Sequence, residues 1–161
     1  MLAPATMGGR FPLARATAGE RSPSSHGRHA GSYDPLMTGV EAVVAAYWEA
    51  ADARDWARFG ELLADDVVYE APQSRERVRG REPYLRFNAE GFPGEWRISV
   101  ERIVAGERDA VSLIRLTEPG GEQPAICFFE LDAAGRIARI TDFWPEPYEP
   151  PAGRAHLTER F

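Results

Sequence analysis

Four apolar runs of strand length in the second half of the chain, joined only by short turns, constrain the fold most strongly. The runs cover residues 96–104, 110–117, 124–131 and 136–144. The segments between them, Gly106–Asp109, Pro119–Gly121 and Asp132–Gly135, carry the Gly, Pro and Asp that are typical of turns. Connections this short cannot provide the crossover that parallel strands need. The runs therefore predict a mainly antiparallel sheet.

The first half of the chain predicts helices that pack against this sheet. One amphipathic face appears at helical spacing in Val40, Val43, Val44, Tyr47, Trp48 and Ala51. Thr38–Glu41 fits a capping box at the start of that helix. Asp55 predicts the cap of a second helix that ends near Asp65 and Asp66. Helices followed by a run of strands indicate an α+β domain with a curved sheet.

A short strand and a third helix are predicted between these two halves. The strand is Val67–Glu70, and a polar, Arg-rich loop follows it over Gln73–Arg81. Pro83 favours the first turn of a short helix that runs through Asn88.

Composition divides the chain into three parts. Residues 1–36 are rich in Gly, Pro, Ser, Ala and Arg without hydrophobic periodicity, which predicts a disordered N-terminal extension. Residues 37–147 form the predicted domain, and residues 148–161 form a Pro-rich C-terminal tail. All 19 basic residues are Arg, a bias typical of a GC-rich bacterial genome.

Charge and residue usage argue against several classes of function. A net charge of −6 disfavours nonspecific binding to nucleic acid. No apolar run reaches the roughly 18 to 20 residues of a membrane span, so no membrane insertion is expected. The single cysteine, Cys127, predicts no internal disulfide, favours a cytoplasmic location and reads as an inert buried thiol. The three histidines lie outside the predicted core, so we expect no metal site and no cofactor.

Asp142 is the strongest candidate for chemistry because it interrupts an apolar strand face. Side chains alternate along a strand, so Asp142 shares one face with Ile140 and Trp144. A carboxylate there is unfavourable to bury unless it is paired or its shifted pKa is used. We predict Asp142 as a general acid or base.

Arg115 and Tyr69 are the predicted partners of Asp142. Arg115 lies among aliphatic residues on its strand, and we expect it to pair with Asp142, either as part of the pocket or as a structural ion pair. Tyr69 could donate a hydrogen bond to a ligand oxygen, or could be a core aromatic residue. We predict a pocket lined by Tyr47, Trp48, Phe129, Ile140 and Trp144.

Several strands are apolar on both faces, so one face of the sheet needs a second cover. Residues 124–131 place Ile126 and Phe128 on one side and Cys127, Phe129 and Leu131 on the other. We expect the second face to be covered by a partner subunit in a homodimer or by the C-terminal tail.

The order of elements, with Val67–Glu70, Arg79–Glu82 and Ile140–Trp144, resembles the SnoaL-like branch of the NTF2-like superfamily. The resemblance implies a cone-shaped, curved sheet around helices and a pocket for a small apolar organic ligand. Members include polyketide cyclases, epoxide hydrolases and ketosteroid isomerases. Thr141–Phe143 matches the strand end at which the epoxide hydrolases place an acidic residue, and Asp142 is kept there. The stretch Arg115–Thr117 resembles their Arg-x-Asp, but its second carboxylate is missing.

Three functions follow from these observations. The first is an acid/base enzyme of cyclase, isomerase or hydrolase type, in which Asp142 acts on an apolar carbonyl or polycyclic substrate. The second is a noncatalytic ligand-binding module with the same pocket. The third is a dimerisation module whose cone is filled by side chains.

Overall fold

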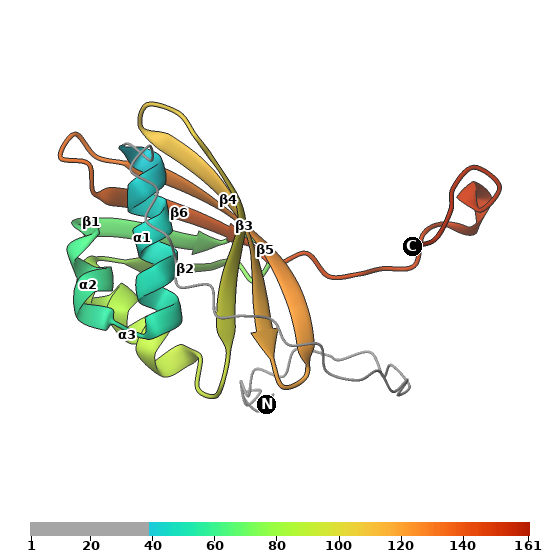
Figure 1. Ribbon diagram of the computed structural model, residues 1–161, viewed down its shortest axis with the longest axis horizontal. Coiled ribbons are helices and arrows are strands. Elements are labelled where there is room, and N and C mark those ends of the chain that lie inside the picture. Colours follow the sequence, from blue (N-terminus) through green and yellow to red (C-terminus); the bar gives the residue numbers. More distant parts are fainter. Residues whose placement is uncertain (1–38) are drawn as a thin grey trace, which may run out of the picture. The chain divides into compact units, whose positions relative to one another are not determined.

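The computed structural model describes residues 39–161, so the predicted extension 1–36 and Thr38 lie outside the described residues. Within that range the order of elements is α1 (Val40–Ala53), α2 (Trp56–Glu61), β1 (Leu63–Ala71), β2 (Glu76–Arg79), α3 (Arg81–Gly91), β3 (Arg97–Ala105), β4 (Asp109–Glu118), β5 (Gly121–Leu131), β6 (Ile137–Phe143) and the 3-10 turn Ala152–Arg154. The helices lie on one side of a curved sheet (Figure 1). The predicted α+β class is confirmed.

The starts of α1 and α2 are set by different caps. Gly39 is the N-cap of α1, with φ 67° and no side-chain hydrogen bond, in place of the predicted capping box. The predicted cap of α2 is confirmed, because the Arg58 amide donates to Asp55 Oδ1 at 3.0 Å. This helix ends at Glu61, earlier than predicted, because Leu63 already pairs with Ile137 as the first residue of β1.

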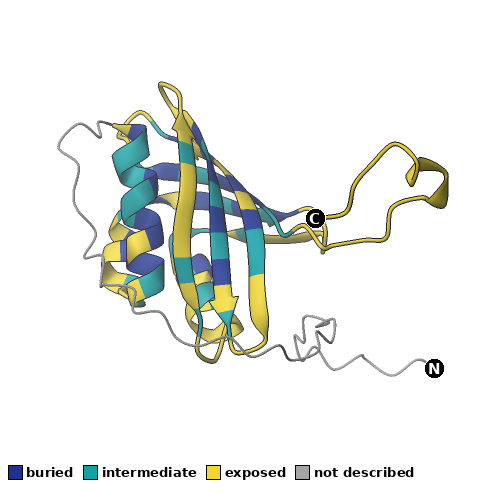
Figure 2. Cartoon of the chain, turned by 45° about the vertical axis from the view of Figure 1, so that its right-hand side comes forward, coloured by how far each residue is buried: buried dark blue, intermediate teal, exposed yellow. Residues whose placement is uncertain are grey.

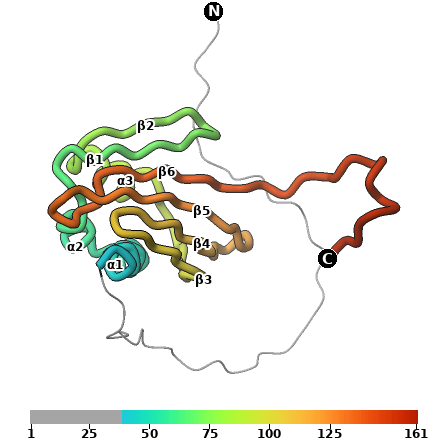
Figure 3. Tube along the Cα trace, turned by 90° about the horizontal axis from the view of Figure 1, so that it is seen from above, coloured from blue at the N-terminus to red at the C-terminus, as the bar shows by residue number. Residues whose placement is uncertain are grey.

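The six strands form one open sheet in the order β2-β1-β6-β5-β4-β3. All neighbours are antiparallel except β1 and β6, which are parallel. Seen from above, the strands follow an arc with the helices on its inner side (Figure 3). Strand β2 lies inside the segment predicted as a loop. The charged residues of β2 show no alternation of polar and apolar side chains that would predict a strand. The segment is a strand because its backbone pairs with β1.

The inner face of the sheet carries the core, and the outer face is also apolar. Along β5 the inward Ala125, Cys127 and Phe129 are buried, whereas the outward Ile126 and Phe128 are 36% and 45% exposed (Figure 2). Residues 145–161 are all exposed, so the C-terminal tail does not cover the outer face. Cover by a partner subunit stays a prediction.

Candidate functional site

Asp142 lies on the inner face of β6, 7% exposed, and accepts hydrogen bonds on both carboxylate oxygens. Cys127 Sγ donates to Oδ1 at 2.7 Å. The Tyr69 hydroxyl and the Trp144 indole Nε1 donate to Oδ2 at 3.3 and 2.9 Å. The donors come from β5, β1 and the residue that follows β6. Asp142 is therefore held by the strands on both sides of its own strand.

Burial dominates the electrostatics of this carboxyl group. Desolvation raises the pKa of Asp142 above its ordinary value, although the hydrogen bonds from Cys127, Trp144 and Tyr69 lower it. Burial also raises the pKa of Tyr69 and of the Cys127 thiol, and the nearby Asp142 charge adds to both shifts. Both donors keep their protons at neutral pH, and Asp142 is a stronger base than an exposed aspartate.

A cavity of about 60 Å³ opens beside Asp142 between α1, α3 and the sheet. Its lining is mostly aromatic and consists of Tyr47, Trp48, Ala51, Tyr69, Tyr84, Phe87, Asn88, Phe92, Trp96, Ile98, Leu116, Asp142 and Trp144. The volume suits about two water molecules. A larger ligand therefore requires the lining to move.

A second polar feature of the cavity is a pair of phenols. The hydroxyl groups of Tyr47 on α1 and Tyr84 on α3 lie 2.6 Å apart, and both residues are buried. Burial raises the pKa of each phenol. One hydroxyl proton is used between the two oxygens, and the other is available to a ligand oxygen. Tyr84 also stacks on Tyr69 with ring centroids 5.0 Å apart.

Helix α3 brings Tyr84 to the cavity because of a glycine at its start. Gly80, the N-cap, has φ 89°, a conformation that side-chain-bearing residues rarely adopt. The Arg81 guanidinium donates to the Leu63 carbonyl oxygen and pairs with Asp65 at 2.7 Å. These contacts anchor the start of α3 to the start of β1.

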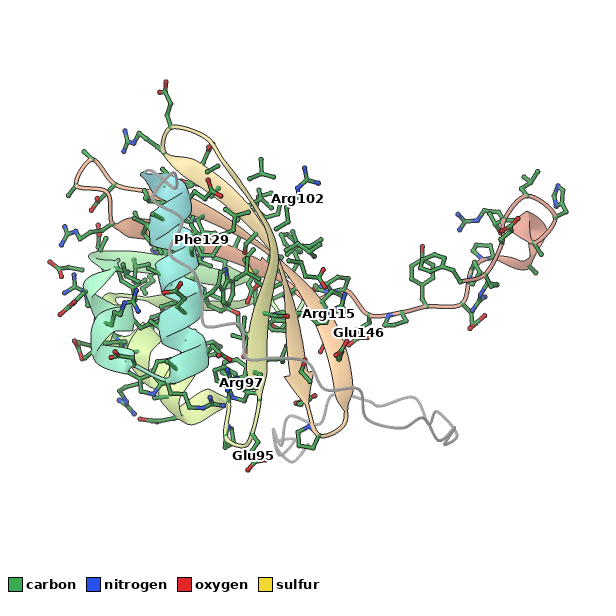
Figure 4. All side chains as sticks on the ribbon, in the orientation of Figure 1. Glu95, Arg97, Arg102, Arg115, Phe129 and Glu146 are labelled. Carbon is green, nitrogen blue, oxygen red and sulfur yellow. The ribbon has the colours of Figure 1, made fainter. Side chains whose placement is uncertain are left out.

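The predicted pairing of Arg115 with Asp142 is wrong. Arg115 lies on the outer face of β4, where its guanidinium pairs with Glu101 and Glu122. Figure 4 shows Arg115 on the side of the sheet away from the helices, and Phe129 toward α1. Strand β5 separates β4 from β6, and the inward residues of β4 are Ala110, Ser112, Ile114 and Leu116. Alternation shows which residues share a face, but it does not show which face is buried.

Of the five predicted pocket residues, three line the cavity and two belong to the core. Tyr47, Trp48 and Trp144 line the cavity. Phe129 and Ile140 are each 1% exposed and belong to the core below it. Tyr69, predicted as a candidate donor, lines the cavity and bonds to Asp142.

Sequence reasoning missed the contribution of α3 and of the connection after it. Tyr84, Phe87 and Asn88 recur at i, i+3 and i+4, which is the spacing of one helix face, and this signal was available. Phe92 and Trp96 flank a short connection whose path depends on tertiary packing. Cys127 is buried as predicted, and burial raises the pKa of its thiol; its hydrogen bond to Asp142 was not predicted.

The described residues contain no group of three or more His, Cys, Asp or Glu side chains suited to a metal ion. Two of the histidines considered in the sequence, His26 and His29, lie outside these residues. Over residues 39–161, no helix is long and apolar enough to cross a membrane.

Residues 44–140, more than half of the chain, match the SnoaL-like domain family. The chain belongs to this family, and the predicted NTF2-like cone fold is confirmed. A proposed ketosteroid isomerase from Kribbella flavida DSM 17836 is 44% identical with a TM-score of 0.71, over 74% of this chain and 87% of that chain.

Two more distant structures show the fold alone. One is a proposed SnoaL-like polyketide cyclase from Shewanella denitrificans OS-217, 15% identical with a TM-score of 0.60, over 70% of this chain and 92% of that chain. The other is a Mycobacterium tuberculosis protein in complex with estradiol-17β-hemisuccinate, 18% identical with a TM-score of 0.56, over 66% of this chain and 93% of that chain. No curated protein matches the sequence.

Proposed function

We propose that this protein is an acid/base enzyme that moves a proton next to a carbonyl group in an apolar, ring-containing substrate. The observation that carries the proposal is a single buried carboxyl group of raised pKa in the wall of an aromatic cavity. A general base works best when its pKa lies near the working pH. The 44% identity to a proposed ketosteroid isomerase supports this class of reaction.

The proposed reaction is a proton shuttle. The Asp142 carboxylate takes a proton from the carbon beside the carbonyl, and the C–H electron pair moves to give an enolate. A phenol of the Tyr47–Tyr84 pair donates a hydrogen bond to the enolate oxygen. Asp142 then returns its proton to a carbon of the same substrate, so that the product is an isomer and no cofactor is consumed.

The size of the cavity restricts how such a substrate binds. Typical ligand sites have volumes of about 300 to 1,000 Å³, far above the 60 Å³ beside Asp142. A wider hollow of about 510 Å³ lies beyond Trp96, the one residue that lines both spaces. We propose that the Trp96 ring moves to join the two when a ring-containing ligand binds.

A noncatalytic ligand-binding module is the alternative. It is favoured by the three hydrogen-bond donors on Asp142, which satisfy the carboxylate without a substrate. In that case the same apolar ligands bind, and Asp142 only shapes the pocket wall.

We also propose that the outer face of the sheet joins two copies of this chain. Val104, Ile126 and Phe128 are 55%, 36% and 45% exposed there. Charged pairs flank these residues, with Arg115 and Glu101 on one side and Arg139 and Glu130 on the other. An apolar centre with a polar rim is typical of a protein interface.

The proposed location is the cytoplasm, because the one cysteine is a free thiol.

The proposal is tested with a β,γ-unsaturated ketosteroid, whose isomerisation produces an absorbing conjugated enone. We expect Asp142→Asn to lower turnover by about 10² to 10⁴, the usual contribution of a positioned acid/base group. Asp66→Asn makes the same chemical change on exposed β1 and should leave turnover unaltered. Equal turnover in wild type and Asp142→Asn would remove the mechanism. Binding of the steroid without turnover in either protein would favour the binding module.

A further inference from the structure

Three polar residues form a row across the otherwise apolar inner face of the sheet. Ser112 on β4 is paired directly with Cys127 on β5, and Cys127 is paired directly with Asp142 on β6. Ser112 and Cys127 have no exposed surface, and Asp142 is 7% exposed. Buried polar groups are retained where hydrogen bonds satisfy them, so the row is expected to act as a connected unit.

The direction of the hydrogen bonds in this row is fixed from one end. Trp48 Nε1 donates to Ser112 Oγ at 3.0 Å, and an indole nitrogen can only donate. The Ser112 hydroxyl therefore keeps its own proton, which it can donate to the sulfur of Cys127, the residue paired directly with it on β5. The thiol proton in turn points to Asp142 Oδ1 at 2.7 Å. In the row Trp48, Ser112 and Cys127, each side chain can thus donate in the same direction, toward the Asp142 carboxylate.

The two oxygens of Asp142 have different surroundings as a result. Oδ1 contacts Cys127, which is absent from the cavity lining. Oδ2 contacts Tyr69 and Trp144, which both line the cavity. We propose that Ser112 and Cys127 are positioning residues that hold Asp142 from behind and leave Oδ2 as the oxygen that exchanges protons with a ligand. This inference rests on the acid/base function proposed above.

The chemistry of sulfur explains why a thiol suits this position. A thiol is a weak hydrogen-bond donor, so it orients the carboxylate without stabilising the anion as strongly as a hydroxyl does. Replacing Cys127 by a stronger donor should therefore lower the pKa of Asp142, and removing the donor should raise it. A residue that only fills space would not give shifts of opposite sign.

The experiment is a carbon NMR titration of the full chain labelled at the aspartate side chains, with the Asp142 signal assigned by Asp142→Asn. We expect Cys127→Ser to lower the pKa of Asp142 and Cys127→Ala to raise it, each by about one unit. Ser112→Ala removes the hydroxyl behind the thiol and should raise the pKa of Asp142 in the same direction as Cys127→Ala. Ser99→Ala, on exposed β3, is its control and should cause no shift. The other titratable groups facing Asp142 are Tyr47 on α1, Tyr69 on β1, Tyr84 on α3 and Cys127 itself. All have raised pKa values, so Asp142 alone titrates at acidic to neutral pH.

A second measurement needs no variant. The chain has one cysteine and therefore one S–H stretching band in a Raman spectrum. We expect this band to move to higher frequency as Asp142 is protonated and the thiol hydrogen bond weakens. A band that does not change with pH, or Cys127 variants that shift the pKa of Asp142 in the same direction or not at all, would overturn the inference.

Neither measurement depends on turnover. Opposite pKa shifts together with an unimpaired Asp142→Asn enzyme would refute the proposed function and leave the orientation of Asp142 established. Loss of turnover in Asp142→Asn without these shifts would refute the positioning roles alone.

Discussion

At the scale of a single residue, the burial of Asp142 links the stability of the protein to pH. The folded protein holds the Asp142 proton to a higher pH than the unfolded chain, whose carboxyl has a pKa near 3.8. The folded state thus binds more protons between the unfolded and the folded pKa, and its free energy of unfolding falls as the pH rises through that window. Above the folded pKa this contribution is constant.

We therefore expect the stability of wild type relative to Asp142→Asn to decrease with pH above about 4 and then level off. Urea unfolding at a series of pH values measures the difference. The same series for Asp66→Asn corrects for a general loss of carboxylate charge. A difference that stays constant or increases with pH would contradict the raised pKa.

The conformation of Trp144 shows how one residue is held by contacts distant in sequence. The Gln73 side chain accepts from the Trp144 amide at 2.6 Å and donates to its carbonyl oxygen at 2.9 Å, as a neighbouring strand would. This directs the indole of Trp144 to Asp142. The strand pattern of the sequence indicates that Asp142 and Trp144 share a face. It does not indicate that the side-chain amide of Gln73, 71 residues away, holds the backbone of Trp144.

At the scale of an element, the proposed movement of Trp96 depends on the connection between α3 and β3, which carries this residue. The Arg54 guanidinium carbon lies 3.9 Å from the centre of the Trp96 ring, and Trp96 Nε1 donates to the Phe92 carbonyl oxygen. Gly94 has φ 114°, which bends the connection between these two aromatic residues. The Trp96 ring is thus held in place by one cation–π contact and one hydrogen bond.

We expect Trp96→Ala to accelerate binding of a bulky apolar probe, anilinonaphthalene sulfonate, by about two- to fivefold, since even an exposed cation–π contact contributes about 0.5 to 1 kcal/mol. Stopped-flow fluorescence measures the rate. Trp96→Phe keeps a ring over Arg54 but loses the hydrogen bond to the Phe92 carbonyl oxygen, so it should bind the probe at a rate between those of wild type and Trp96→Ala. Equal rates for Trp96→Ala and wild type would mean that the probe reaches the cavity by another path.

The elements themselves differed in how far the sequence predicted them. The four strands from β3 to β6 were predicted within a few residues, because hydrophobic patterns and turn residues agree there. Strand β2 and the early end of α2 were missed, because both depend on pairing with distant strands. The apolar residues Leu62 and Leu63 fit a helix and a strand equally well, and the contact with Ile137 decides between them.

At the scale of the whole molecule, the exposed outer face of the sheet predicts the state of assembly. If two copies pack through this face, the wild type should have about twice the 17.9 kDa mass of one chain. We expect Phe128→Arg to give monomers, because the charge would be buried without a partner. Light scattering after size exclusion measures the mass. Tyr148→Arg makes a comparable change on the exposed tail and should remain dimeric. A monomeric wild type would contradict the proposal directly.

The parallel pairing of β1 with β6 has a consequence for folding. The hydrogen bond between Tyr69 and Asp142 spans 73 positions of the chain, and contacts that close such long loops form slowly. The meander from β3 to β6 can pair between neighbours in sequence, whereas the carboxylate gains its phenol partner only when the first strand docks beside the last. During synthesis the helices and most of the sheet leave the ribosome before Asp142 does. The hydrogen-bonded carboxyl group is therefore assembled only in a chain whose sheet is already formed, and, if Asp142 acts as proposed, partly folded chains cannot turn over a substrate.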